Sequence, residues 1–507
     1  MGYCLFIICI LFKIQFLKNI IYHDFTICNE SKGLYVFNSY YLIGSKHIKT
    51  ILKGVMKMNI DNKKSLQSDT IILFEKGMNG SANYRIPSLI TTSKGTLIAA
   101  IDARVHEPGD NPNKIDKVVK RSIDQGVTWS DVNTIVSYPG YGRENGAAAI
   151  DPAMLEDKET QTIWMIYSHT PARIGLWNSE PGTGFSEERY RLLYDTKGNS
   201  YTLQEEGRVF DENGEETLMK VDTEGYVYKE GKEIGNIYLA DSQLFESKTS
   251  FLQIIYSKDD GVTWSKPREL NMEVKAPWMQ FIGSGPGVGI QLTLSKYRGR
   301  LIFPVYFSNT IDRKMSCAVI YSDDHGETWK MGTSPNDGRK AGNTLLSAET
   351  LAETDYELTE SQVVELDNGD LKAFMRNHNK KRRTATSISK DGGETWGEVV
   401  FQDTLLDPIC QASVIKYPDQ GDGRCRVIFS NPADEKERVN GTIRLSEDGG
   451  KTWSYSRLLK EGSYVYSSLT VLPNGHIGIL YETEENGDMK NCFTTFSLEW
   501  IMEGENK

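Results

Sequence analysis

The sequence is poor in cysteine and has no apolar run long enough to cross a membrane. Seven cysteines occur among 507 residues, and none has the spacing of a metal site. Three lie within the first 28 residues, and the others are scattered at Cys317, Cys410, Cys425 and Cys492. We therefore expect a reduced chain without essential disulfides, and we expect no metal or other cofactor.

Positive charge is also in deficit. Lysine and arginine number 58 against 69 aspartates and glutamates, so the formal net charge is −11. A negative chain repels the phosphate backbone, which argues against nucleic acid as the main partner.

The first 57 residues differ from the rest of the chain. Their apolar run, Cys4–Phe12, is too short to span a bilayer. No basic residue precedes it and no small-residue cleavage site follows it, which weakens the case for a signal peptide. Lys53–Met58 can be encoded by a bacterial ribosome-binding sequence placed before Met58, so we predict that residues 1–57 are a leader outside the native protein. A start near Met58 predicts a cytoplasmic protein, whereas a working signal in the apolar run predicts a secreted one.

One eight-residue pattern, Ser-x-Asp-x-Gly-x-Thr-Trp, occurs five times without departure. The copies, called boxes below, span residues 122–129, 257–264, 322–329, 389–396 and 446–453. Each fits a hairpin turn in which Asp accepts backbone N–H groups, Gly takes a positive φ and Trp packs against the next strand. Regular recurrence predicts a radial array of small sheets, a β-propeller. The box aspartates are assigned to this scaffold and not to chemistry.

A second repeat counts the blades. Short turns precede apolar, strand-length runs at Gly95, Gln161, Gly299, Gly369, Gly423 and Gly475. Six such hairpins predict an all-β fold, a six-bladed β-propeller over residues 68–505. The interval between Gln161 and Gly299 is unusually long, which predicts a small β-rich insertion domain at 173–246. It would be either a cap beside a site or a tolerated surface excursion.

Chemically distinctive residues stand at equal offsets from these turns. The residues seven positions after a turn glycine are Asp102, Tyr306, Arg376 and Glu482. Those nine or ten positions before a turn are Arg85, Asp151, Glu360 and Tyr466. Strands often end in polar residues, which would explain any one position. Equal offsets in equivalent hairpins, however, bring side chains to one rim of a propeller, so the whole set favours a site.

The segment Tyr84-Arg-Ile-Pro87, the five boxes and the residues at the rim, in this order, resemble the bacterial exo-sialidases (neuraminidases) over roughly residues 70–505. The similarity is greatest to large bacterial sialidases whose propeller carries an inserted domain. It implies an enzyme that removes terminal α-linked sialic acids from glycoproteins, glycolipids or oligosaccharides.

The resemblance implies a carboxylate clamp of three arginines, Arg85, Arg376 and Arg438, with Glu482 orienting the first. Arginine suits this role because it stays charged and binds a carboxylate through two parallel hydrogen bonds. A surface arginine in solvent is the alternative for Arg438, which lies in a charged loop. For Arg376, which ends an apolar strand, that alternative is poor.

The resemblance also implies Tyr466 as nucleophile, Glu360 as its base and Asp102 as the acid that protonates the leaving oxygen. The substrate's own carboxylate would repel an anionic nucleophile, whereas a tyrosine deprotonated by a neighbouring base avoids this repulsion. Tyr464 competes for the role, but its offset differs by two.

Further family positions line the sugar. Arg104 is expected near the sugar's 4-hydroxyl, Asp151 in the pocket for the N-acyl and glycerol groups, and Tyr306 and Trp278 at the rim.

Two other functions fit part of this pattern. An intramolecular trans-sialidase, which releases an anhydro-sialic acid, shares the catalytic residues, although the stretch 278–289 resembles hydrolytic members more. A non-catalytic propeller that binds sialoglycans would keep the arginines and lose the nucleophile pair, and both members of that pair are present here.

Overall fold

The computed structural model describes residues 27–30, 33–36, 67–294 and 296–504. The chain divides into two units, Met1–Ser65 and Leu66–Lys507. In the first unit, β1 (Ile27–Glu30) and β2 (Gly33–Val36) form an antiparallel hairpin. The apolar run Cys4–Phe12 and Met58 lie outside the described residues, so the leader at 1–57 stays a prediction.

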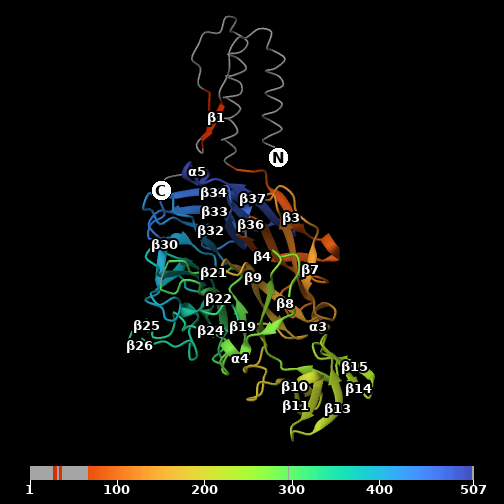
Figure 1. Cartoon of the computed structure of the whole chain (residues 1–507). Helices are drawn as coiled ribbons and strands as arrows, with labels where there is room; N and C mark the ends of the chain where they lie inside the picture. Colours follow the sequence, from red (N-terminus) through yellow and green to blue (C-terminus); the bar gives the residue numbers. More distant parts are fainter. Residues whose placement is uncertain (1–26, 31–32, 37–66, 295, 505–507) are drawn as a thin grey trace, which may run out of the picture. The chain divides into compact units, whose positions relative to one another are not determined.

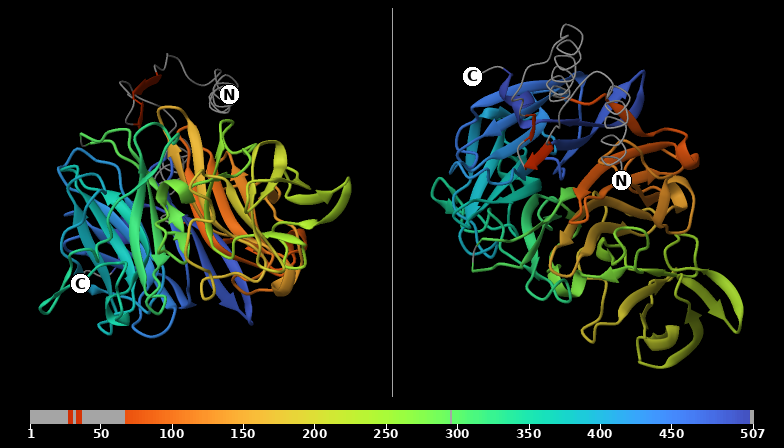
Figure 2. Two further views of the ribbon diagram at one scale, coloured as in Figure 1. Left: turned by 90° about the horizontal axis from the view of Figure 1, so that it is seen from below. Right: turned by 45° about the horizontal axis from the view of Figure 1, so that its top comes forward.

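The second unit is all-β, as the sequence predicts, and its sheets have a propeller-like arrangement (Figures 1 and 2). Its helices are no longer than five residues. They are η1 (Met78–Gly80), α3 (Gly142–Asn145), η2 (Glu205–Gly207), α4 (Asn271–Val274), η3 (Thr354–Tyr356) and α5 (Leu498–Met502). Among the residues that the structure describes, no helix has the length and apolar character needed to cross a membrane.

Three sheets are simple four-stranded antiparallel groups. The first contains β27 (Leu358–Glu365), β28 (Leu371–Asn377), β29 (Arg383–Ser389) and β30 (Val400–Leu406). The second contains β31 (Ser413–Lys416), β32 (Val427–Pro432), β33 (Val439–Ser446) and β34 (Tyr455–Ser463). The third contains β35 (Ser467–Val471), β36 (Ile477–Glu485), β37 (Asp488–Phe496) and, from the start of the unit, β3 (Ile71–Glu75).

Two larger sheets complete the propeller-like array. The five-stranded sheet contains β19 (Ile282–Ser284), β21 (Ile290–Gln291), β22 (Leu301–Ser308), β23 (Met315–Ser322) and β24 (Lys330–Met331). The nine-stranded sheet contains two antiparallel groups and β20 (Gly287–Val288). The groups are β4 (Asn83–Thr91), β5 (Leu97–Arg104), β6 (Ile115–Ser122) and β7 (Asn133–Val136), then β8 (Ala148–Asp157), β9 (Thr162–Thr170), β17 (Phe251–Ser257) and β18 (Arg268–Glu269). One parallel pair, Ile115 with Ala148, joins the two groups.

A separate seven-stranded sheet falls between β9 and β17 in sequence and stands apart in Figure 1. Its strands are β10 (Arg191–Asp195), β11 (Ser200–Leu203), β12 (Arg208–Asp211), β13 (Glu216–Val221), β14 (Tyr226–Lys229), β15 (Lys232–Asn236) and β16 (Leu244–Glu246). It has its own small core, which includes Leu193, Val209 and Val227. Side-chain contacts tie it to neighbouring strands: the buried Glu246 contacts the buried His169 of β9, and the partly buried Arg191 contacts Glu269 of β18. A two-stranded hairpin, β25 (Lys340–Ala341) with β26 (Thr344–Leu345), completes the sheets.

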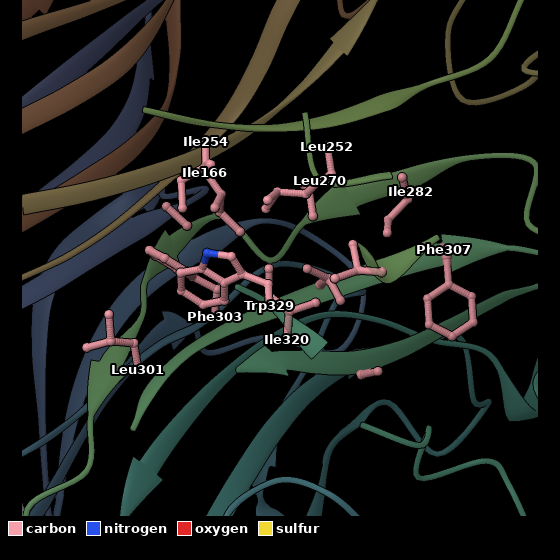
Figure 3. Packing of buried hydrophobic residues seen from close by; sticks show 14 of the residues in the cluster. Ile166, Leu252, Ile254, Leu270, Ile282, Leu301, Phe303, Phe307, Ile320 and Trp329 are labelled. Atoms are coloured by element: carbon pink, nitrogen blue, oxygen red, sulfur yellow. The ribbon is translucent and has the colours of Figure 1, made fainter. Parts of the chain in front are cut away.

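The boxes form the turns that the sequence predicts. In the third box, Asp324 Oδ1 accepts the Thr328 N–H at 2.9 Å, and Gly326 has a φ of 92°. Trp329 donates its Nε1–H to the Gly326 carbonyl at 3.1 Å and is 2% exposed. Figure 3 shows this tryptophan among aliphatic residues from β9, β17 and β22, with Phe303 at 5.5 Å between ring centroids. The box therefore both closes its own turn and packs one sheet against the next.

Candidate active site

Three strands that carry candidate residues are interrupted by β-bulges close to where they begin. The register shifts lie at 85–88 in β4, 150–153 in β8 and 358–361 in β27. Ile86 and Asp151 there have φ of 67° and 64°, a conformation that residues with a side chain rarely adopt. Because a bulge re-aims the side chains beside it, each of these strands presents one candidate residue at its bulge.

Tyr466, Glu360 and Arg376 form one hydrogen-bonded group. The Tyr466 hydroxyl donates to Glu360 Oε1 at 2.5 Å. Arg376 Nη1 donates to Glu360 Oε2 at 2.6 Å and to the Tyr466 oxygen at 2.7 Å. Burial raises the pKa of Tyr466 well above its ordinary value, although the Arg376 charge opposes this shift. The phenol is thus protonated at rest, with a carboxylate placed to accept its proton and a cation placed to stabilise the phenolate.

Arg85 is held by Glu482 in a two-pronged ion pair. Its Nε donates to Oε1 at 3.0 Å and its Nη2 to Oε2 at 2.9 Å. The wholly buried carboxylate also accepts the backbone N–H of Ile86 at 2.7 Å and of Tyr466 at 3.1 Å. Burial alone would raise the pKa of Glu482, but Arg85 and these hydrogen bonds lower it below its usual range. Glu482 is therefore ionised, and it fixes both the first arginine and the backbone of Tyr466.

Three arginines surround Tyr466. The guanidinium carbons of Arg85 and Arg438 lie 5.3 Å and 5.7 Å from its ring centroid, while Arg376 contacts its oxygen. Arg438 is oriented by the carbonyl of Ile409, to which its Nη2 donates at 2.9 Å. The buried Nε of Arg376 has no hydrogen-bond partner among the described residues. The three guanidinium groups and the unpaired Nε–H of Arg376 are suited to bind an anionic ligand.

A second group is centred on Asp102, which is completely buried on β5. Its carboxylate contacts the Lys117 ammonium, accepts the Asp151 N–H at 3.1 Å and lies 3.8 Å from Arg104 Nη2. Arg104 is 1% exposed and pairs with Asp110 at 2.6 Å. Burial raises the pKa of Asp102, and the two cations oppose that shift without cancelling it. A raised pKa is the direction that a general acid needs.

Asp151 and Tyr306 lie between the two groups. The Tyr306 hydroxyl donates to Asp151 Oδ2 at 3.3 Å. Burial, followed by the charges of Asp102 and Glu360, raises the pKa of Asp151 well above its ordinary value. Arg85 of the first group lies opposite Asp102 of the second in the register of β4 against β5, so the two groups are adjacent.

The structure therefore brings together the residues that the sequence singles out. Arg85, Glu360, Arg376, Arg438, Tyr466 and Glu482 form the first group, and Asp102, Arg104, Asp151 and Tyr306 form the second. Trp278 instead packs edge-on against Phe307, 5.6 Å away, at the border of a hydrophobic cluster.

Two residues of the site were not found from the sequence. Lys117 lies on β6, directly opposite Asp102 in the antiparallel register, and only that register gives it a role. Asp407 accepts the Cys410 N–H at 3.0 Å in the loop that presents the Ile409 carbonyl to Arg438. An acid before a proline in a loop carries no comparable signal in the sequence.

The chain is similar to several known proteins. Residues 225–479 match the family model described as a BNR repeat-like domain. The chain is 31% identical to the anhydrosialidase of Macrobdella decora, over 81% of this chain and 59% of that protein. It is 30% identical to a sialidase of Bacteroides fragilis, over 87% of this chain and 69% of that protein.

Among solved structures, the intramolecular trans-sialidase of Ruminococcus gnavus in complex with oseltamivir carboxylate superposes with a TM-score of 0.73 at 28% identity. That match covers 85% of this chain and 97% of the other. The chain belongs to the sialidase family. It spans 59% of the length of the Macrobdella decora relative.

Proposed function

We propose that the protein is a retaining exo-sialidase that hydrolyses terminal α-linked sialic acids on glycoproteins, glycolipids or oligosaccharides. The observation that carries this proposal is the contact of Tyr466 with Glu360 at 2.5 Å, with Arg376 bound to both. Glu360 takes the phenolic proton while the phenolate oxygen attacks the anomeric carbon, which gives a tyrosyl-sialosyl intermediate. The adjacent arginine stabilises the negative charge that develops on the phenol oxygen.

Substrate orientation follows from the cations around the tyrosine. Arg85, Arg376 and Arg438 bind the sialic acid carboxylate, which places the anomeric carbon over the Tyr466 oxygen. The Glu482 pair keeps Arg85 in position before substrate arrives, so little ordering is needed on binding. A carboxylate nucleophile in this setting would face the substrate's own negative charge, whereas a neutral tyrosine does not.

An acid beside Arg104 protonates the glycosidic oxygen as its bond to the anomeric carbon breaks. Asp102, the residue expected from the sequence, has a side chain that is 0% exposed, whereas Asp110, which pairs with Arg104 at 2.6 Å, is 66% exposed and open to a substrate. In the second half of the reaction the resulting carboxylate accepts a proton from water, which attacks the same carbon and releases the phenolate of Tyr466. Glu360 then returns its proton to the phenolate. Arg104, Asp151 and Tyr306 border this acid and line the pocket for the sugar's ring substituents and side arms.

An intramolecular trans-sialidase is the second candidate. The observation that favours it is the similarity to the Macrobdella decora anhydrosialidase and to the Ruminococcus gnavus enzyme. In that reaction a hydroxyl of the sugar itself, and not water, attacks the intermediate and gives an anhydro-sialic acid.

Product NMR with 3′-sialyllactose tests the proposal. Free sialic acid that appears first as the α-anomer supports a retaining hydrolase. An anhydro sugar as the main product supports the second candidate instead. Binding of the sialoside without any turnover would overturn both and leave a non-catalytic glycan-binding protein.

For the architecture we infer six blades and an inserted domain. The six groups begin with β4, β8, β19–β22, β27, β31 and β35, and successive first strands contact one another around to β4 again. The single parallel pair between β6 and β8 is what merges two of these groups into one sheet. We also infer that residues 173–246 are an insertion within the second blade, because the seven-stranded sheet separates β9 from its partner β17.

A further inference from the structure

Tyr141 and Trp177 are exposed to an unusual degree for large aromatic side chains, at 71% and 69%. No other Tyr, Trp or Phe among the described residues is more than 37% exposed. A single exposed ring is ordinary on a protein surface. These two, however, both border the loop of residues 105–113, which carries Asp110 and is called the acid loop below.

Trp177 lies in the segment between β9 and the seven-stranded sheet, and this segment packs on the acid loop. A Cβ built on Gly175 would lie only 2.5 Å from the carbonyl oxygen of Asn111, the residue after Asp110. Leu176 packs against the hydrophobic cluster that contains Tyr306, a residue of the candidate active site. Trp177, the next residue along the chain, is therefore at the border of that site.

Tyr141 borders the same loop through His106. The centroids of the two rings are 3.8 Å apart, and the Gly142 N–H donates to His106 Nδ1 at 3.3 Å. The segments of the two aromatic residues are also joined to each other, because Arg173 Nε donates to the Glu144 carbonyl at 3.0 Å. Three stretches of chain thus meet around the acid loop.

Asp110 connects the acid loop to the site. It pairs with Arg104 at 2.6 Å and is 66% exposed. Burial would raise the pKa of Asp110, but the charges of Arg104, Arg85 and Arg438 lower it below its ordinary value, so this carboxyl is within reach of the carboxylate clamp. In a glycosidase the general acid contacts the oxygen that joins the sugar to its leaving group. The leaving group therefore lies beside the acid loop.

We propose that Trp177 and Tyr141 form the subsite for the first sugar of the leaving group, a neutral pyranose such as the galactose of 3′-sialyllactose. This inference rests on the proposed sialidase function and deepens it. A face of a pyranose that carries C–H bonds stacks on an aromatic ring, while its hydroxyls need polar partners. Arg143 is one such partner, since its Nη1 would lie 2.8 Å from a Cβ built on Gly109 of the acid loop.

Two substrates that share the sialic acid separate this role from a structural one. Methyl α-sialoside has no second sugar, whereas 3′-sialyllactose releases lactose. Trp177→Ala and Tyr141→Ala should each lower kcat/KM for sialyllactose by about three- to tenfold and change the value for methyl sialoside by less than about twofold. Release of lactose or methanol is the measurement, because hydrolysis and anhydro-sugar formation both release them.

The double variant decides the outcome. Its loss should be confined to sialyllactose and exceed that of either single variant. Equal losses on both substrates would place the two aromatics in the catalytic machinery, and an unchanged value for sialyllactose would leave them without a role in binding; either result would overturn the proposal. Both side chains are exposed, so the variants should melt close to the wild type.

Tyr256→Ala is the matched control. Tyr256 is an aromatic residue of β17 that is 37% exposed and directly precedes the second box, so its removal should leave the ratio of the two kcat/KM values unchanged. Trp177→Phe should keep most of the wild-type ratio, because a smaller ring still stacks on the sugar. A wild-type chain that releases neither lactose nor methanol would contradict the proposed function itself. If it releases both, only the subsite is under test.

Discussion

Tyr466 is held by hydrogen bonds at both its hydroxyl and its backbone. Its hydroxyl donates to Glu360 and accepts from Arg376, so the proton has a defined destination before any substrate binds. Its backbone N–H is held by Glu482, which also holds Arg85. The nucleophile and the carboxylate clamp are therefore positioned by one shared carboxylate.

Tyr466→Phe should remove most of the activity and leave the fold intact. The change deletes only the phenolic oxygen, so turnover of 4-methylumbelliferyl sialic acid should fall by at least about a hundredfold. Binding of sialic acid, measured by calorimetry, should persist because the arginines remain. Near wild-type turnover would show that another residue is the nucleophile. Tyr464→Phe is the matched control, because Tyr464 is the competing candidate for that role.

Arg376→Lys should not behave as a conservative change. Lysine keeps the charge but loses the planar two-pronged donor set, and one charge-assisted hydrogen bond is worth ~1.5–3 kcal/mol, roughly ten- to a hundredfold in KM. Because Arg376 also binds Glu360 and Tyr466, kcat should fall as well.

The control is Arg444→Lys, at a buried arginine that contacts Asn431. This variant should keep kcat and KM near the wild-type values. A methyl ester of the sialoside should be a poor substrate for the wild type. Cleavage of the ester at the rate of the free acid would show that the arginines do not read the carboxylate.

At the residue scale, the sequence predicts positions along equivalent strands better than contacts across them. Equal offsets from turn glycines point to Glu360, Arg376 and Tyr466, and these residues do meet. Lys117 could not be predicted, because its contact with Asp102 depends on the register of β5 against β6. Ten residues connect these two strands, and a connection of that length does not determine their register from the sequence. Their roles in the reaction remain predictions that the variants above test.

At the level of the element, each box has two structural roles, closing its turn and packing against another strand. Asp391 shows the first: its carboxylate accepts the Thr395 N–H at 2.8 Å and the Ser389 hydroxyl at 2.8 Å, which closes the turn. Gly326 shows the second: a Cβ built there would lie 2.5 Å from the Trp164 ring, so glycine is needed for close approach as well as for its φ of 92°. The turn was predictable from composition, whereas this contact between strands far apart in the sequence was not.

Asp391→Ala should therefore cost stability and not catalysis. Loss of the turn hydrogen bonds should lower the free energy of unfolding by about 1–2 kcal/mol. Activity per folded molecule should stay close to the wild-type value. Asp488→Ala, which breaks an exposed ion pair with Lys76, should change stability by less than about 0.5 kcal/mol. An inactive variant with unchanged melting would mean that the box takes part in the chemistry.

The loop that carries Ile409 contains a carboxyl, Asp407, that should make the stability of the fold depend on pH. Burial raises the pKa of Asp407 from 3.8 to about 6, against the opposing Cys410 N–H and Arg376 charge. Below about pH 4 the carboxyl is protonated in both folded and unfolded states. As the pH rises from about 4 to about 6, only the unfolded state ionises freely, so stability is lost across this window.

Asp407→Asn should abolish that loss while keeping an acceptor for the Cys410 N–H. Between pH 4 and 7, urea unfolding of the wild type should lose up to about 3 kcal/mol more than the variant does. Equal pH profiles for the two proteins would show that Asp407 titrates normally in the fold.

For the whole molecule, the sequence predicts an all-β chain, and this is confirmed. The periodic turns explain why, since every repeat combines a tight turn with an apolar strand. The sequence does not predict the pair between Ile115 and Ala148 that merges two groups into one sheet, because such pairing depends on the long connections around it. It also does not predict that β3, from the start of the unit, joins the sheet of β35, β36 and β37 at its end. The reason is that β3 is a short run with no turn motif of its own.

Removal of β3 should destabilise the entire second unit. The strand pairs with β37 from Ile71 to Glu75, and it buries Leu73 and Phe74 at 2% and 0% exposure. Phe74 also packs against Tyr84 of β4, with ring centroids 5.5 Å apart, so the strand ties the last sheet to the first. A chain of residues 66–507, which begins where the second unit begins, is the reference for this change.

A chain of residues 77–507 should melt well below the 66–507 chain, since it loses one sheet strand and two buried side chains worth ~1.5–3 kcal/mol each. Phe74→Ala in the full chain isolates the packing part of this effect and should cost about 3–5 kcal/mol. Circular dichroism melts of the three proteins measure these differences. If the 77–507 chain had the same melting temperature as the 66–507 chain, β3 would contribute nothing to stability. The contacts among the inner strands would then be enough to stabilise the propeller-like array.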